Sequence, residues 1–178
     1  MVSAVMITLS AQSEPEFLLN SEIMKSGGRW RIVNDGVMGG LSSSKATLSD
    51  SGIIQFSGIV SLENNGGFAS LRSPVKNYDF EKYSGIEIRI KGDGQRYSLS
   101  MKETAYFTGS FYTENFETRK DEWITFKIPF DSFALYYFGN KVRTNPKIPL
   151  NKIMEISLLI GEKQEGAFNA EIDYIKLF

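Results

Sequence analysis

The feature that most constrains the fold of this chain is an alternation of apolar and polar residues with a period of two. In residues 86–90 three isoleucines alternate with charged side chains, and in residues 97–101 three apolar side chains alternate with serines. Such alternation is typical of strands with one buried and one solvated face. Because an Asp-Gly pair lies between the two runs, in residues 92–95, we expect a tight hairpin there.

The same criteria predict further strands, separated by turns rich in Gly, Asn and Asp: residues 29–33, 43–48, 53–62, 68–73, 110–116, 122–128, 153–160 and 168–178. In the last of these the apolar side chains change from even-numbered to odd-numbered positions, which predicts a β-bulge near Asp173–Tyr174. Helical periodicity is weak, with a turn or short helix expected in residues 14–24 and a single turn in residues 129–133. The sequence therefore predicts an all-β fold, an antiparallel β-sandwich or jelly roll.

Composition bounds the size and the chemistry of this fold. With 178 residues, of which 42% are hydrophobic, the chain can form one domain whose core needs no cross-links. We expect that sandwich domain to span residues 29–178. The chain contains neither cysteine nor histidine, which excludes disulfides, Cys/His zinc sites, thiol nucleophiles and Ser-His-Asp triads. Carboxylate and lysine mechanisms remain open.

The net charge of −1 gives no broad field that would favour nucleic acid or an anionic membrane. No run approaches the roughly 20 apolar residues of a transmembrane helix. We expect the N-terminal segment, residues 1–28, to form an edge strand or a short helix. Residues 1–13 carry no charged side chain, so residues 1–11 also fit a signal-peptide remnant, although no basic segment precedes them. A cytoplasmic location or one peripheral to the inner membrane is favoured, and export is the alternative.

Two loops, residues 33–40 and 62–70, combine paired glycines with Asn, Asp and Glu. We consider a binding surface built from them and from a nearby arginine: Asn34, Asp35, Glu63, Asn64, Asn65 and Arg72. Such oxygen-rich side chains suit sugar hydroxyls or a hard cation such as calcium. The alternative is that Asp35 and the asparagines satisfy the backbone of their own turns.

A second candidate patch combines aromatic and basic side chains: Tyr136, Tyr137, Lys141 and Arg143. Lys147 and Lys152 follow, and no acid interrupts residues 141–152. Such a patch suits a membrane surface, an acidic partner or single-stranded nucleic acid. The alternative is a solvated loop, which the near-neutral charge of the chain favours.

Aromatic side chains could also form a platform for a sugar, since their faces combine apolar area with a polar handle. The candidates are Trp30, Tyr97, Tyr106, Tyr112 and Trp123. Both tryptophans lie on strand patterns, which favours packing in the core. Several carboxylates occupy strand and turn positions, but the sequence does not define a pair at the separation that a glycosidase needs.

Residues 30–40, Trp-Arg-Ile-Val-Asn-Asp-Gly-Val-Met-Gly-Gly, resemble the opening signature of the complex I intermediate-associated protein 30 family. Residues 56–58 and 61–70 are similar to its second motif, and residues 89–97 to its third. Residues 116–123, 129–130 and 166–175 follow in the same order. The resemblance runs from about Trp30 to Phe178.

The resemblance implies a β-sandwich like that of galactose-binding domains and a role like that of assembly factors that hold intermediates of respiratory complex I. It implies no catalytic residues. Small members without a long N-terminal extension resemble bacterial ones. One departure is residues 137–141, Tyr-Phe-Gly-Asn-Lys, where members commonly have Phe-Arg-Gly-Arg.

We therefore expect a non-enzymatic domain without a cofactor that binds a protein partner, such as an intermediate of a respiratory or other membrane complex, through the end that bears the two loops of residues 33–40 and 62–70. A carbohydrate-binding module is the alternative function. A carboxylate-based hydrolase is the alternative if the domain is catalytic.

Overall fold

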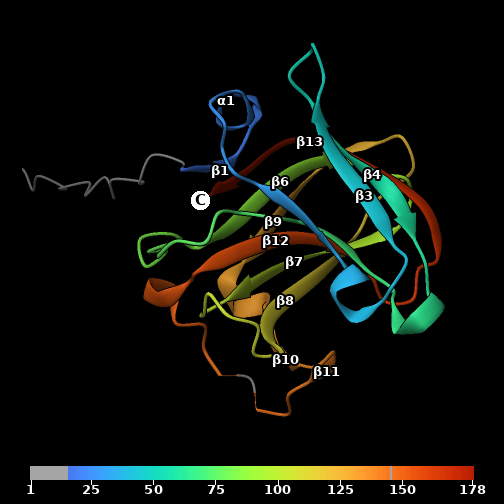
Figure 1. The fold of residues 1–178 in the computed structure, drawn as a ribbon. Coiled ribbons are helices and arrows are strands. Elements are labelled where there is room, and N and C mark those ends of the chain that lie inside the picture. Colours follow the sequence, from blue (N-terminus) through green and yellow to red (C-terminus); the bar gives the residue numbers. More distant parts are fainter. Residues whose placement is uncertain (1–15, 145) are drawn as a thin grey trace, which may run out of the picture.

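The computed structural model describes residues 16–144 and 146–178, and within them the strands form two antiparallel sheets (Figure 1). The six-stranded sheet has the order β3-β4-β13-β6-β9, with β1 paired to the end of β13. Its strands are β1 (Phe17–Leu19), β3 (Ser43–Leu48), β4 (Ile54–Val60), β6 (Gly85–Lys91), β9 (Trp123–Pro129) and β13 (Gly166–Leu177).

The seven-stranded sheet has the order β11-β10-β8-β7-β12-β5-β2. Its strands are β2 (Arg31–Asn34), β5 (Ala69–Arg72), β7 (Arg96–Lys102), β8 (Ser110–Glu117), β10 (Ala134–Tyr137), β11 (Asn140–Lys141) and β12 (Glu155–Ile160). The fold is thus an antiparallel β-sandwich, and the all-β prediction is confirmed.

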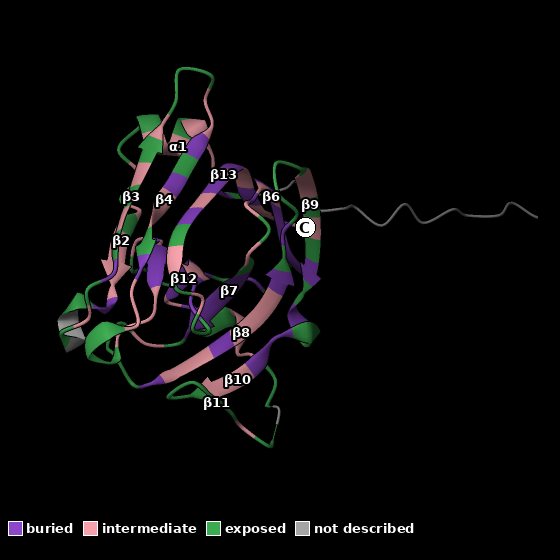
Figure 2. Cartoon of the chain, turned by 90° about the vertical axis from the view of Figure 1, so that its right-hand side faces the viewer, coloured by how far each residue is buried: buried purple, intermediate pink, exposed green. Residues whose placement is uncertain are grey.

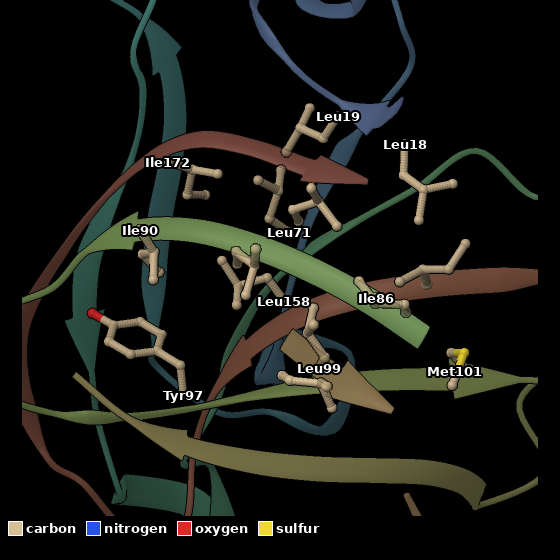
Figure 3. Packing of buried hydrophobic residues seen from close by; sticks show 14 of the residues in the cluster. Leu18, Leu19, Leu71, Ile86, Ile90, Tyr97, Leu99, Met101, Leu158 and Ile172 are labelled. Carbon is tan, nitrogen blue, oxygen red and sulfur yellow. The ribbon is translucent and has the colours of Figure 1, made fainter. Parts of the chain in front are cut away.

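The apolar side chains predicted by the alternation meet between the two sheets (Figure 3). The three isoleucines of β6 are fully buried, as are Tyr97, Leu99 and Met101 of β7. Buried segments occupy the centres of the strands, and exposed residues gather in the loops at the periphery (Figure 2). The alternation therefore identified the core faces of both strands correctly, whereas the opposite faces are less solvated than predicted, since Glu87, Ser98 and Ser100 are also buried.

The predicted β-bulge in β13 is confirmed. The register with β6 shifts between Ile172 and Tyr174. Because of this extra residue, Ile172 and Ile175 are both completely buried although they have opposite parity. The long final strand can therefore follow the core along its whole length.

The predicted hairpin at residues 92–95 is wrong. β6 pairs with β9 and β13, whereas β7 pairs with β8 and β12 in the other sheet. The connection is a crossover between the sheets, in which Asp93 accepts hydrogen bonds from the backbone of Gln95 at 3.1 Å and of Asn169 at 2.8 Å. An Asp-Gly turn determines the local reversal of the chain, but the pairing of each strand depends on the packing of the whole sandwich.

Helical elements are short. They are the α-helix α1 (Ser21–Lys25) and the 3₁₀ turns η1 (Asp35–Met38), η2 (Glu63–Asn65), η3 (Phe130–Ser132) and η4 (Leu150–Lys152). The side chain of Asn20 caps α1 by accepting from the Ile23 amide at 2.9 Å. The turn η3 confirms the single turn expected in residues 129–133. Within the described ranges, α1 falls well short of the length that a bilayer span requires.

The N-terminal segment contains both elements that were considered for it, since β1 extends the six-stranded sheet and α1 follows it. The possible signal remnant, residues 1–11, lies outside the described residues.

Candidate functional site

The two motif loops meet at one end of the sandwich. The 3₁₀ turns η1 and η2 lie side by side in Figures 1 and 2. They are connected through the side chain of Asp35, which is only 1% exposed. We call residues 34–42 together with residues 61–68 the loop pair.

The Asp35 carboxylate accepts four hydrogen bonds. Its Oδ1 accepts from the amide of Ser42 at 3.0 Å, and its Oδ2 accepts from the hydroxyl of Ser42 at 2.5 Å. Across the loop pair, Oδ2 also accepts from the amides of Gly67 at 2.6 Å and Phe68 at 3.2 Å. One carboxylate thus joins two loops that are separated by about thirty residues in the chain.

Glycine is required at two positions because the backbone packs directly against this carboxylate. A Cβ on Gly40 would lie 2.4 Å from Cγ of Asp35, and a Cβ on Gly66 would lie 2.6 Å from Oδ2. The Ser42 hydroxyl extends the network, since it accepts from the Ser61 amide at 3.0 Å. One glycine of each pair, Gly40 or Gly66, is therefore explained by the approach of the backbone to Asp35, and the other, Gly39 or Gly67, by its positive φ of 86° or 132°.

Burial of Asp35 disfavours its charged form, but the hydrogen bonds from Ser42, Gly67 and Phe68 outweigh it and lower the pKa of the carboxyl. Asp35 is therefore ionised at neutral pH. Its oxygens are occupied by donors of the protein itself, as the turn-chemistry interpretation of the sequence expects.

The other candidate residues of the loop pair have different environments. Asn34 accepts a hydrogen bond from the Ser44 hydroxyl at 2.7 Å. Glu63, Asn64 and Asn65 are exposed, and both asparagines have positive φ, 54° and 59°. Asn tolerates this left-handed conformation better than most residues. The exposed side chains of η2 are available to a ligand, and a binding role for them stays a prediction.

Arg72 does not join the loop pair. Asn34 is paired with Ala69 at one end of β5, whereas Arg72 lies at the other end, paired with Arg31. The Arg72 guanidinium instead contacts Glu155 of β12 at 3.4 Å. The structure therefore divides the predicted set into the loop pair and a separate charged cluster.

The second predicted patch forms a β-hairpin. Tyr136 and Tyr137 end β10, Lys141 belongs to β11 and is paired with Tyr136, and Arg143 follows exposed. The hairpin lies at the outer edge of the seven-stranded sheet, at the bottom of Figures 1 and 2.

Exposed aromatic side chains gather beside this hairpin. Four are more than half exposed: Tyr106 81%, Phe107 65%, Tyr137 53% and Phe138 58%. The ring of Phe107 contacts those of Phe138 and Phe111, with centroids 5.9 Å and 6.2 Å apart, and the rings of Tyr137 and Phe138 are 4.7 Å apart. We call these five residues the aromatic cluster.

Sequence reasoning found only part of this cluster. It named Tyr137 in a segment that also contains Phe138 and, for another role, Tyr106, but it missed Phe107 and Phe111. The available signal was the pair Tyr106–Phe107 in a glycine-containing loop, where apolar side chains have no strand face to occupy. The two contributing loops are about thirty residues apart, so their proximity follows only from the pairing of β8 with β10.

The proposed sugar platform does not form from the five aromatic residues considered for it. Tyr97 and Tyr112 are buried in the core, and Trp30 packs against it while its indole N–H donates to the Leu18 carbonyl at 3.0 Å. The guanidinium of Arg89 lies 4.7 Å from the ring centroid of Trp123. Tyr106, at 81%, is the one member of the five that is largely exposed.

Among residues 16–144 and 146–178, no group of three or more Asp and Glu side chains converges as a metal site would require. The arrangement therefore offers surfaces for binding, with hydrogen-bonding groups at η2 and apolar area at the aromatic cluster.

Comparison with solved structures identifies the class of fold, a galactose-binding-like β-sandwich. A family 11 carbohydrate-binding module of a Clostridium thermocellum cellulosomal cellulase superposes with a TM-score of 0.62 at 19% identity, covering 99% of this chain and 96% of that module. A solution structure of the same family 11 module, CtCBM11, gives 0.63 at 17% identity, covering 96% and 98%. At these identities the likeness concerns the fold alone.

The chain belongs to the complex I intermediate-associated protein 30 family, whose model matches residues 17–172. The protein "Complex I intermediate-associated protein 30, mitochondrial" of Drosophila melanogaster is 27% identical over 171 residues, which cover 84% of this chain and 58% of the relative. The protein of the same name from Mus musculus is 28% identical over 109 residues, covering 57% and 32%. The chain thus matches only part of the length of these relatives.

Proposed function

We propose that this protein is a non-catalytic binding domain that holds a protein partner through the aromatic cluster. The observation that carries the proposal is the gathering of Tyr106, Phe107, Tyr137 and Phe138 on one exposed surface. Half of the exposed large hydrophobic side chains of the described residues belong to this single site. Contiguous exposed apolar patches on soluble domains mark sites of interaction.

The composition of the cluster suits a protein surface. Aromatic side chains are enriched at protein–protein interfaces and provide much of the binding energy there, because each buries a large area with few rotatable bonds. The ring contacts, at 4.7–6.2 Å between centroids, hold four of the five side chains near one another before binding, namely Phe107, Phe111, Tyr137 and Phe138. Such preorganisation lowers the entropic cost of association.

The backbone also fixes the cluster. The Phe138 amide donates to the carbonyl of Gly109 at 2.8 Å, which ties the β10–β11 turn to the loop before β8. The ring of Phe138 covers Gly109, where an added Cβ would lie 2.6 Å from the ring. The two loops therefore present their aromatic side chains as one unit.

The charge beside the cluster indicates the chemistry of the partner. Lys141 and Arg143 are exposed on the same hairpin, and residues 141–152 contain no acid. An acidic surface on the partner would complement them and accelerate association. The curated relatives are named for association with an intermediate of complex I, so we propose that the partner here is a subunit of a respiratory or other membrane protein complex.

Carbohydrate binding is the second function that was considered, and it rests on the sandwich fold shared with carbohydrate-binding modules. Fold alone does not determine function. The burial of Tyr97 and Tyr112 and the covering of Trp123 leave that alternative without its platform. Protein binding is the function that the geometry supports better.

The proposal is tested by affinity capture from cells of the native source, followed by identification of the retained proteins. The test variant is Phe107→Ser combined with Phe138→Asn, since Asn tolerates the positive φ of 45° at residue 138. The control is Ile59→Ser, which removes an equally exposed apolar side chain, 56% exposed, from β4 of the other sheet. We expect wild type and control to retain the same membrane-complex subunit and the double variant to lose it.

Equal retention of that subunit by the double variant would contradict the assignment of the surface. Retention of no such subunit by the wild type, together with hits on a glycan array, would favour carbohydrate binding instead.

A further inference from the structure

A cluster of charged side chains lies on the outer face of the seven-stranded sheet, across four neighbouring strands. It consists of Lys102 on β7, Glu155 on β12, Arg72 on β5 and Arg31 on β2. Each is next in the chain to a residue whose side chain lies in the core or packs against it, namely Met101, Ile156, Leu71 and Ile32. Because successive side chains of a strand point to opposite faces, the charged residues lie on the face turned away from the core.

Glu155 is the centre of this cluster. Its Oε1 lies 3.0 Å from Nζ of Lys102 and 3.4 Å from Nη1 of Arg72, and its Oε2 accepts from Nη2 of Arg31. The two arginines are also held from outside the cluster. Arg31 donates to the Ser73 carbonyl at 3.0 Å, and Nε of Arg72 donates to the Ser70 hydroxyl at 2.9 Å.

The charges in the cluster do not balance. Among residues 16–144 and 146–178, Glu155 is the one carboxylate in ion-pair contact with any of the three cations, which leaves a formal excess of two positive charges. The side chains of Lys102, Arg72 and Glu155 are only 9%, 13% and 3% exposed. Positive charge withdrawn from water in this way is costly unless an anion compensates it.

The lowered pKa of Arg72 agrees with this imbalance. Burial lowers the pKa of its guanidinium, the nearby charge of Arg31 lowers it further, and the attraction of Glu155 does not restore it. The one cation with an open side is Arg31, whose side chain is 43% exposed. A ligand from solvent would therefore reach the cluster over Arg31.

A row of small polar side chains leads away from the two arginines across the sheet. Across the neighbouring strands β2, β5, β12, β7 and β8, the residues that pair directly with one another are Arg31, Arg72, Ser157, Ser100 and Thr113. Ser100 and Ser157 are buried although they lie on the outer face, and the hydroxyls of Ser100 and Thr113 are hydrogen-bonded to each other at 2.9 Å. Small hydroxyl side chains therefore flank the cations on this face, and a hydroxyl can both donate and accept hydrogen bonds.

We propose that Arg31, Arg72 and Lys102 form a binding site for an oxyanion, a carboxylate or a phosphate group carried by a protein partner. Guanidinium groups suit both ions because they can donate two parallel hydrogen bonds to either. The identity of the carrier rests on the proposed function, whereas the site itself does not. On β8, Phe111 of the aromatic cluster lies two residues before Thr113 of the row and therefore on the same face of the sheet, so one partner could engage both.

The site is tested by calorimetric titration of the full chain with two probes, inorganic phosphate and a blocked tri-glutamate peptide, against chloride at equal ionic strength. Arg31→Gln removes the accessible cation, and we expect it to weaken binding of the effective probe by about tenfold, or 1.4 kcal/mol. The matched control is Arg89→Gln on the other sheet, where a partly exposed guanidinium forms a balanced pair with Asp173 at 2.6 Å. The control should bind as the wild type does.

A second variant predicts a gain. Glu155→Gln removes the negative charge that competes with an added anion for the three cations. The effective probe should therefore raise the melting temperature of this variant by more than that of the wild type. Binding of phosphate alone assigns a phosphorylated group, and binding of the peptide alone assigns a carboxylate. Failure of both probes, or equal affinity of wild type and Arg31→Gln, would overturn the site. Because no partner is needed, this outcome is independent of the capture experiment.

Discussion

The loop pair and the aromatic cluster are opposite in construction. The loop pair contains the most recognisable sequence of the chain, and its central side chain, Asp35, is buried and occupied by four donors of the protein itself. The aromatic cluster is built from loop residues and the ends of two strands, β8 and β10, and four of its five side chains are more than half exposed. One region uses its polar groups internally, and the other leaves its apolar surface uncovered.

The difference separates what identifies the family from what contacts a partner. A motif rich in Gly, Asn and Asp is conspicuous because a specified backbone path demands those residues. In this protein that demand is explained by the approach of Gly40 and Gly66 to Asp35. The recognisable residues therefore hold two loops in place, and the proposed contact surface lies elsewhere.

The largest effect should follow from Asp35→Ala. The substitution leaves the amides of Ser42, Gly67 and Phe68 without their acceptor in a buried site. We expect it to lower the free energy of unfolding by about 3–5 kcal/mol, since several buried donors lose a charged partner at once. Urea denaturation measures this as a lower midpoint.

Asp50→Ala is the control, because that aspartate is exposed in the turn between β3 and β4. It should change the free energy of unfolding by less than about 0.5 kcal/mol. If the two substitutions cost the same, Asp35 does not connect the loops.

A smaller effect is expected from pH. The folded-state pKa of Asp35 is lowered, so its charge contributes stability above the ordinary pKa of an aspartate, and this contribution is lost as the pH falls through the lower, folded-state value. Asp35→Asn keeps the shape of the side chain but does not titrate. The difference in unfolding free energy between wild type and Asp35→Asn should therefore be largest near neutral pH and shrink below about pH 4.

Denaturant titrations of both proteins at a series of pH values test this. Comparison with the variant cancels the contributions of other carboxyls, such as Glu87, whose pKa is also lowered. A difference that stayed constant into the acid range would show that the charge of Asp35 is not what joins the loops.

The sequence was sufficient to predict the sandwich because strand faces are determined by local alternation. Even the bulge near Asp173–Tyr174 followed from a change of parity within β13. The prediction of a hairpin at residues 92–95 was wrong because strand pairing is not determined locally, and β6 pairs with β9 and β13. The short strands β10 and β11 were also missed, since four and two residues carry too little alternation to be recognised.

The sites were predicted less well, for a related reason. Asp35 and the asparagines could be named as turn residues, but the donors from Gly67 and Phe68 come from the other loop. Arg72 was grouped with the loops by its position in the chain, whereas the pairing of β5 with β12 brings it to Glu155. The exposure of Phe107 and Phe138 depends on whether another segment of the chain packs over them, which a sequence does not show.

The smallest effect on stability should come from the aromatic cluster. In Phe107→Ser combined with Phe138→Asn, side chains that are 65% and 58% exposed are replaced, so little buried apolar area is lost and the free energy of unfolding should change by less than about 1 kcal/mol. Urea denaturation measures this, beside the capture experiment on the same variant. A loss as large as that of Asp35→Ala would mean that the rings are part of the core and are not a free surface. An unchanged midpoint with lost capture would show that this region contributes to binding without contributing to folding, the reverse of what is expected for the loop pair.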